Sequence, residues 1–315
     1  MATEESKLHN PRLVAVWPGM GHVAISAGYY LMAKLHMDLF TEVAAQDLFD
    51  IDAVEIKDVI LQAGRFPRSR FFIWHDPNQK HDLIVFIGEA QPPLGKFHFC
   101  RSLIELAKGW GVERVLTFAA MATEVGLKER ACVFCTASNQ GLLESLKPHG
   151  LAVLTQGQIS GLNGVLLAAA VEAGIEGACL LGEMPHIFAQ LPFPKASLAV
   201  LQAFEKISGV KIDLGEMERQ AEMMNMKLTD LLKHVERENG EDELGEPGGY
   251  EEGEFETIPA EEDRLSPVDR ERIETLFTES AADRSKAYEL KRELDRVGVF
   301  AEYEDRFLDL FKKKS

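Results

Sequence analysis

Apolar and polar positions follow two patterns along residues 11–208. Short apolar runs, typical of buried strands, alternate with stretches in which apolar residues recur every three or four positions, as on one face of a helix. The predicted strands are Leu13–Trp17, Leu39–Val43, Phe71–Trp74, Leu83–Ile87, Arg114–Phe118, a segment around Val133, Gln158–Ile159 and Ala178–Leu181. The predicted helices are Val23–Leu35, Phe97–Lys108, Gln140–Leu146, Asn163–Glu172 and Lys195–Ile207. This alternation indicates βαβ units, so we expect an α/β fold: a three-layer α/β/α sandwich with a mostly parallel sheet.

A longer helical pattern follows. Its apolar residues are spaced by four and three positions, a heptad-type seam formed by Met217, Ala221, Met224, Leu228, Leu231 and Val235. Such a seam predicts one long helix over 216–237 that packs against a partner. Residues 11–235 then form one α/β domain that ends in this helix.

Most of the acidic charge lies in one segment. The formal charge is −17, and the 28 residues from Glu236 to Asp263 contain thirteen acidic residues and one arginine. They hold −12 of the total, which leaves −5 for the other 287 residues. The segment is rich in glycine and poor in apolar residues, so burial cannot offset the entropy of ordering it. We predict a flexible acidic linker over 236–264. The nearly neutral remainder argues against nucleic-acid and membrane partners.

A helical C-terminal segment is predicted over 265–315. Ser266 and Pro267 form a start signal, a hydroxyl cap followed by proline at the first helical position. Three apolar stripes follow: Ile273, Leu276 and Phe277; Leu290, Leu294 and Val297; Phe300, Tyr303, Phe307, Leu310 and Phe311. We expect a small helical hairpin or bundle whose stripes pack against the seam of the long helix.

Features of a secreted or membrane protein are missing from the sequence. The N-terminus lacks the basic and apolar regions of a signal peptide, and the longest apolar stretch, Val165 to Val171, is too short to span a bilayer. The four cysteines lie in apolar runs, as reduced thiols do: Cys100, Cys132, Cys135 and Cys179. We expect a cytoplasmic protein.

The first predicted strand ends in a glycine turn. Gly19, Gly21 and Ala24 fit G-x-G-x-x-A at the start of a helix, and Glu42 follows about 20 residues later, as in a dinucleotide-binding fingerprint. A proline and His22 crowd a turn that needs free backbone amides for that role. We therefore interpret it as a tight strand-to-helix turn.

A second glycine cluster, residues 157–164, also precedes a helix. Its amides could hold an anion at the positive end of the helix dipole, or its glycines could let the helix lie close against the sheet, which we favour. The carboxyl ends of parallel strands are where open α/β sheets bind ligands. The candidate ligand cleft at this edge comprises Gly19, Gly21, His22, Gly161, Asn163, Gly164 and Glu183.

The sequence contains no recognisable catalytic or metal-binding constellation. Cys132 and Cys135 form a C-x-x-C within an apolar run, without a second such pair, and none of the nine histidines forms H-x-x-x-H. We expect no catalytic residues, no metal site and no cofactor.

Several sequence blocks, taken in order, carry a family resemblance. They are P-G-M-G-H-V-A-I-S-A-G-Y-Y-L at 18–31, H-D-L-I-V-F-I-G-E-A-Q-P at 81–92, G-V-E-R-V-L-T-F-A-A-M-A-T-E at 111–124 and G-Q-I-S-G-L-N-G-V-L-L at 157–167. The set resembles the proteasome assembly chaperone family, in its bacterial and archaeal branch. The resemblance covers 11–235 and implies an α/β sandwich similar to that of purine nucleoside phosphorylases. It also implies a helical C-terminal extension like that of bacterial relatives.

The resemblance implies protein partners. Eukaryotic and archaeal members of the family help to assemble proteasome α-subunits and form oligomers. We therefore expect a homo-oligomer, with a trimer as one form, and another protein as partner. Archaeal members dock through a C-terminal tail of a hydrophobic residue and a tyrosine, whereas this sequence ends L-F-K-K-K-S at 310–315. We expect no docking by that route.

Two functional hypotheses follow. The first is a non-enzymatic, self-associating chaperone-like or scaffold protein. The alternative is a protein or enzyme that binds a nucleotide or another phosphate-containing ligand in the strand-end cleft. That alternative includes the carboxylate-amine ligase label sometimes given to relatives, although the sequence shows no metal-binding carboxylate set or nucleotide-binding lysine of that class.

Overall fold

The computed structural model describes residues 8–43, 48–49, 55–57, 60–62, 66–241 and 265–312. The strands are β1 (Arg12–Val16), β2 (Asp38–Val43), β3 (Glu55–Lys57), β4 (Ile60–Gln62), β5 (Ser69–Trp74), β6 (Leu83–Gly88), β7 (Arg114–Thr123), β8 (Val133–Ala137), β9 (Ala152–Val153) and β10 (Glu176–Pro185). The helices are α1 (Val23–Lys34), α2 (Lys96–Gly109), α3 (Gln140–Leu146), α4 (Leu162–Glu172), α5 (Pro194–Ser208), α6 (Gly215–Glu241), α7 (Pro267–Ala282), α8 (Ala287–Arg296) and α9 (Phe300–Asp309). Single 3-10 turns lie at Met20–His22, Lys147–His149, His186–Phe188 and Arg284–Lys286.

One eight-stranded sheet organises the fold, in the order β2-β5-β6-β1-β7-β10-β8-β9. Strands β6, β1, β7 and β10 are parallel neighbours, whereas β5 and β8 run antiparallel to them on either side. The sheet is therefore mixed with a parallel centre, which confirms the predicted fold class. The predicted hairpin is present as β5 and β6, which pair from Ser69 with Gly88 to Trp74 with Leu83.

Side chains alternate between the two faces of the central strands. In β1, Val14 and Val16 belong to the core on one face, while Leu13 and Ala15 belong to the core on the other. The first core contains buried residues of α1 and α5, and the second contains those of α2 and α4. Helices therefore cover both faces, as a sheet with a parallel, fully buried centre requires.

One predicted strand is absent, and one pair of strands was not predicted. Gln158 and Ile159 are not a strand, because they lie between Gly157 and Gly161, whose positive φ angles of 145° and 72° turn the chain toward α4. The short edge strand β9 precedes them, pairing only two residues with β8. A separate ribbon of β3 and β4 was also not predicted.

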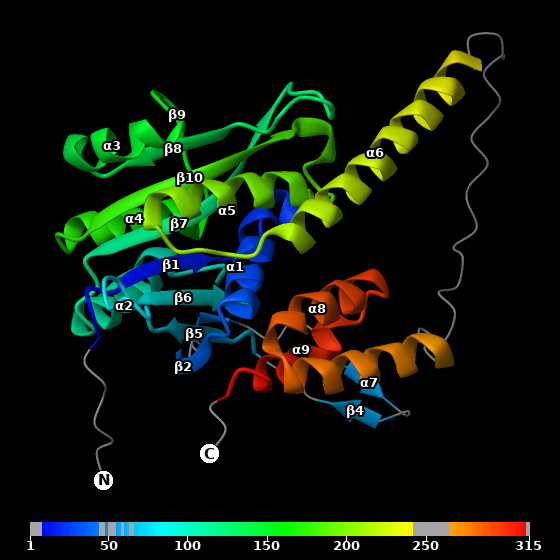
Figure 1. The fold of residues 1–315 in the computed structure, drawn as a ribbon, viewed down its shortest axis with the longest axis horizontal. Coiled ribbons are helices and arrows are strands. Elements are labelled where there is room, and N and C mark those ends of the chain that lie inside the picture. The colour runs from blue at the N-terminus through cyan, green and yellow to red at the C-terminus, as the bar shows by residue number, and fades with distance from the viewer. Residues whose placement is uncertain are drawn as a thin grey trace.

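The C-terminal helices α7, α8 and α9 form a bundle that packs beside α1 (Figure 1). Ten of the twelve residues of α1 are buried, so this helix is covered on the side away from the sheet as well. The Tyr29 ring meets Phe300 and Phe307 edge-on at centroid distances of 5.5 and 5.8 Å, and the Tyr30 ring lies 4.7 Å from that of Tyr288. The bundle therefore completes the core around α1.

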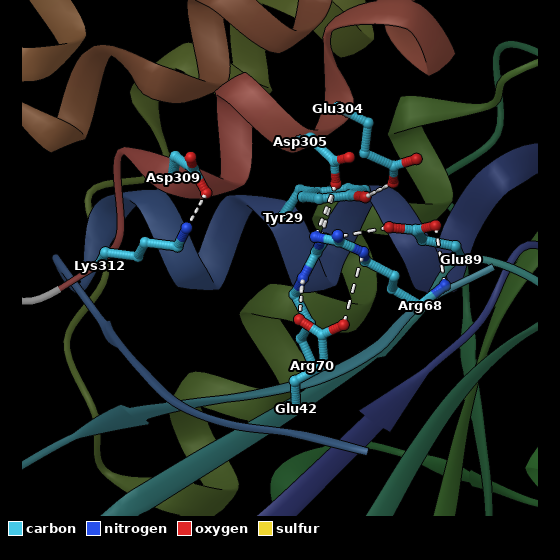
Figure 2. Close-up of polar contacts among 9 residues, drawn as sticks. All are labelled: Tyr29, Glu42, Arg68, Arg70, Glu89, Glu304, Asp305, Asp309 and Lys312. Atoms are coloured by element: carbon cyan, nitrogen blue, oxygen red, sulfur yellow. Dashed lines mark hydrogen bonds and ion pairs between the residues drawn. The ribbon is translucent and has the colours of Figure 1, made fainter. Parts of the chain in front are cut away.

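Polar contacts fix the bundle to the edge of the sheet (Figure 2). Arg70, on β5, is only 4% exposed and binds Glu42 at 3.2 Å, Glu89 at 2.9 Å and Asp305 of α9 at 2.8 Å. Tyr29 donates a hydrogen bond to the buried Glu304 at 2.8 Å. Burial and this carboxylate raise the pKa of the Tyr29 hydroxyl, which keeps it protonated and able to donate.

The long helix α6 packs mainly on α5 rather than on the bundle, so the predicted partner for the C-terminal stripes was wrong. Its first turns meet the bundle, where Tyr288 donates to Gln220 at 2.8 Å. The stripes pack on α1 because that helix is apolar on all sides. The predicted linker, 236–264, overlaps the end of α6 and otherwise lies outside the described residues.

Replacing Arg70 tests how strongly the bundle is fixed. Arg70→Met removes the guanidinium from three carboxylates, two of them on the sheet domain and one on the bundle. We expect a loss of about 2 kcal/mol in the free energy of unfolding, because the buried Glu89 carboxylate loses this charged partner, whereas Glu42 and Asp305 are partly exposed and stay paired with Arg68. Urea denaturation measures this loss.

The matched control is Arg272→Met, on the same bundle. Its ion pair with Glu289 is solvent-exposed, so we expect a loss below about 1 kcal/mol. Equal losses for the two variants would contradict the buried role of Arg70.

Candidate functional site

The carboxyl ends of the central strands β6, β1, β7 and β10 meet at one end of the sheet. We call this end the strand-end edge, to distinguish it from the outer strands of the sheet. From β1 the chain enters α1 on one face, and from β6 it enters α2 on the other. Neighbouring strands whose connections leave to opposite faces define a topological switch point, where open α/β sheets place their ligands. The candidate cleft residues are therefore assessed around this point.

The first glycine turn is hydrogen-bonded to the segment that follows β10. Gly21 has a φ of +60° and His22 a φ of +51°, both left-handed. The Gly21 amide donates to the Ala189 carbonyl at 2.9 Å, and its carbonyl accepts from the Phe193 amide at 2.9 Å. A Cβ at Gly21 would lie 2.6 Å from the Met184 sulfur, whereas one at Gly19 would meet nothing within 4 Å. The turn thus holds α1 against the end of β10.

The second glycine turn permits close contacts at the start of α4. A Cβ on Gly164 would lie 2.0 Å from the carbonyl oxygen of Ile159, and one on Gly161 would lie 2.8 Å from Oε1 of Gln91. The close approach at Gly164 is therefore to the preceding loop, not to the sheet. At Gly161 the φ of +72° adds a second reason for glycine.

Gln91 joins the two turns. It follows β6 and donates from Nε2 to the Pro18 carbonyl at 3.1 Å, while its Oε1 accepts from the Leu162 amide at 3.1 Å. One of the amides that α4 would offer an anion, that of Leu162, is thus already bound. Gln91 was not singled out from the sequence, although a polar residue just after a parallel strand at the switch point was the available signal.

The other two residues of the candidate cleft, Glu183 and Asn163, differ in how their side chains are hydrogen-bonded. Glu183, on β10, accepts from the Thr123 hydroxyl at 2.9 Å and from the Cys132 amide at 3.1 Å, which ties together β7, β8 and β10. Its carboxylate is not hydrogen-bonded to either glycine turn within the described ranges. The Asn163 Oδ1 atom is buried and finds no donor in the part of the chain that the structure describes.

Burial shifts the pKa of three ionisable groups in the α/β domain. Burial raises the pKa of the Cys100 and Cys179 thiols to about 12, so both stay protonated at neutral pH and are poor nucleophiles. Burial lowers the pKa of Lys195, whose ammonium donates to the carbonyls of Leu127 and Glu129. Over the described ranges, no three His, Cys, Asp or Glu side chains cluster as metal ligands would.

Large apolar side chains are exposed along the same edge, and we call them the apolar rim. They are Met20 (44% exposed), Leu94 (75%), Phe97 (41%), Ile187 (55%) and Leu191 (40%). Met20 belongs to the first glycine turn, and the residues after β10 are bonded to that turn. The segment that carries Leu94 and Phe97 begins just after Gln91. Polar groups at this edge are mostly satisfied internally while apolar ones face solvent, as at a protein-binding surface.

No helix among the described residues is both long and apolar enough to cross a bilayer.

Comparison with known proteins places residues 13–232 in the sequence model of the PAC2 family. An uncharacterized protein of Methanocaldococcus jannaschii is 28% identical over 233 residues, which cover 73% of this chain and 86% of that protein. The C-terminal bundle lies beyond the residues that the family model matches.

Solved structures share the fold. Pyrococcus furiosus PbaB, described as an archaeal proteasome activator, has a TM-score of 0.62 and 24% identity, covering 75% of this chain and 97% of its own. A PAC2 family protein of Streptomyces avermitilis has a TM-score of 0.61 and 24% identity, with coverage of 70% and 95%. A proteasome-assembly chaperone homologue of Mycobacterium tuberculosis has a TM-score of 0.60 and 22% identity, with coverage of 70% and 94%.

The close approach at Gly164 can be tested by adding one methyl group. In Gly164→Ala the new Cβ overlaps a backbone carbonyl, which must shift. We expect a loss of about 2 kcal/mol or more in the free energy of unfolding, as in overpacked sites. Thermal or urea unfolding measures it.

Gly109→Ala, in the last turn of α2, is the control because its Cβ would meet nothing within 4 Å. We expect that variant to be neutral or stabilised by less than about 1 kcal/mol, since alanine favours helix. An unchanged stability in Gly164→Ala would contradict the described loop geometry.

Proposed function

Because the chain belongs to the PAC2 family, we propose that it is a non-enzymatic, self-associating scaffold that acts as a chaperone for another cytoplasmic protein. Two structures with the same fold are described as a proteasome activator and as a proteasome-assembly chaperone homologue. Those descriptions support a protein, rather than a small molecule, as its main partner.

The apolar rim carries this proposal. Five large apolar side chains are exposed around the switch point. Exposing them to water is unfavourable, so a partner that covers them would be held by the burial of this surface. The cluster includes Phe97 and Met20, whose large and adaptable side chains suit a binding surface. A partner that presents apolar side chains to this rim would remove them from water.

The internal hydrogen bonds of the edge support the same proposal. Gln91 occupies the amide of Leu162, and Ala189 and Phe193 bind the backbone of Gly21. A phosphate would have to displace these bonds before it could use the same amides. The edge is therefore better suited to present a fixed surface than to receive an anion.

Site-specific photo-crosslinking tests the rim in cells of the native host. A photoreactive amino acid placed at Leu94 should give a discrete adduct with one protein, identified by mass spectrometry. The same amino acid at Val171 is the control, because Val171 is 52% exposed but lies near the end of α4, away from the rim. We expect the Leu94 adduct to weaken severalfold in Ile187→Ser, with unchanged thermal stability. Equal labelling from both positions would contradict the proposal.

A thermal-shift titration tests the small-molecule alternative. Inorganic phosphate and nucleosides should leave the Tm unchanged. A saturable rise in Tm that disappears in Asn163→Ala would instead favour a ligand site at the start of α4, where Oδ1 of Asn163 is buried.

A further inference from the structure

Strands β7 and β10 extend together beyond the end of β1. The pairing of β1 with β7 stops at Ala15 and Thr117, because the chain then turns toward α1. The pairing of β7 with β10 continues as far as Thr123 and Pro185. From Ala119 to Thr123, β7 therefore has a neighbouring strand on one side only. We call the other side of these residues the open edge of β7.

The hydrogen bonds of β10 show which of its residues bond toward β7. The Glu183 amide donates to the carbonyl of Cys132, just before β8, at 2.9 Å. Successive residues of a strand point their N–H and C=O groups to opposite sides, as the ladders of a sheet require. Since Glu183 bonds toward β8, its neighbours Gly182 and Met184 bond toward β7.

The same rule assigns the backbone groups of β7. Gly182 is paired with Ala120, and Met184 is paired with Ala122. In a parallel pair, a residue bonds to the two residues that flank its partner rather than to the partner itself. The N–H and C=O groups of Ala120 and Ala122 thus point away from β10, to the open edge. In the described part of the chain, no hydrogen bond reaches these four groups.

The outer edges of the sheet are protected, whereas the open edge of β7 is not. Strand β9 pairs over only two residues, and β2 carries Asp38 and Glu42. The Leu39 amide of β2 donates to the Phe311 carbonyl at 2.7 Å. Short strands, charges and covering segments are the usual means of blocking an edge. The open edge reads A-A-M-A-T at 119–123, without charge or proline, and its side chains are only partly buried.

The open edge lies beside the apolar rim. The turn Met20–His22 contacts β7, and Met20 is one of the exposed rim residues. A strand added along Ala120 and Ala122 would be bound through its main chain, while its side chains would alternate between the two faces of the sheet. Apolar residues at alternate positions of that strand would then reach the rim.

A single extended segment fits this edge better than a second copy of the chain. Strand β7 of a second copy would bring its own β10 as a neighbour, one strand spacing of about 4.8 Å farther on. That space lies beyond the ends of β1 and β6, where Gln91 bonds to the Pro18 carbonyl at 3.1 Å. A single segment needs only the space in line with β1.

We propose that the open edge of β7 receives an extended segment of the partner protein, which adds one strand to the sheet and places apolar side chains on the rim. The proposal rests on the proposed function and specifies the form in which the partner binds. The free main-chain groups of Ala120 and Ala122 support a strand, because a strand offers N–H and C=O groups at the matching spacing, whereas a helix uses its own internally.

Peptide selection on the full-length protein tests this edge. The probe is a phage-displayed library of random peptides of about twelve residues, long enough for one strand. We expect binders with apolar residues at alternate positions. Their affinity should fall about tenfold or more in Ala122→Pro, because proline lacks the N–H and its ring obstructs pairing. Ala122→Ser, which keeps the N–H, is the matched control and should bind as the wild type does.

Hydrogen exchange of the wild type gives a second readout that needs no variant. The amides of Ala120 and Ala122 should exchange fast in the free protein and slowly with a selected peptide bound. The Met121 amide, which bonds toward β10, should be protected in both states. The Tm of Ala122→Pro should change little, since proline is tolerated where the N–H faces away from the ladder.

Several results would overturn the strand proposal. They are the absence of any selected binder, equal peptide affinity for the wild type and Ala122→Pro, protected Ala120 and Ala122 amides in the free protein, and no added protection with peptide bound. A Leu94 photo-adduct that persists in cells alongside any of these results would leave the proposed function standing. Absence of that adduct as well would overturn both.

Discussion

Helix α1 is buried on nearly all sides, and this burial determines both where the C-terminal bundle packs and how the strand-end turns are held. One side of the helix packs on the parallel strands, and the other must be covered by something else. The C-terminal bundle covers it, with aromatic contacts to Tyr29 and Tyr30 and with the buried guanidinium of Arg70 binding Asp305. A bundle fixed in this way is part of the core. It therefore belongs to the framework that holds the candidate surfaces in place.

The start of the same helix determines what the strand-end edge can do. The first glycine turn leads directly into α1 and is bonded to the segment after β10, while Gln91 links it to α4. Backbone groups that could receive a ligand are thereby used to hold the edge together. The apolar rim at the same edge stays open to solvent. This rim suits contacts between proteins better than chemistry on a small molecule.

The sheet and its helices could be predicted from the sequence because hydrophobic periodicity is local. Packing partners could not, since an apolar stripe shows that a face is buried but not what covers it. The all-apolar pattern of α1 was the missed signal that the bundle packs there. At the candidate site, both glycine turns were found, but Gln91 joins them through contacts more than 70 residues away in sequence. Exposed Leu94 could not be told from a core leucine by its pattern.

We propose that this PAC2 family member works by associating with protein surfaces, including its own. Light scattering across a range of concentrations tests this by measuring the molar mass of the full chain in solution. We expect a mass of two or more chains, at least about 70 kDa against the 35.1 kDa of one chain, with dissociation on dilution. A mass of one chain at every concentration would contradict it.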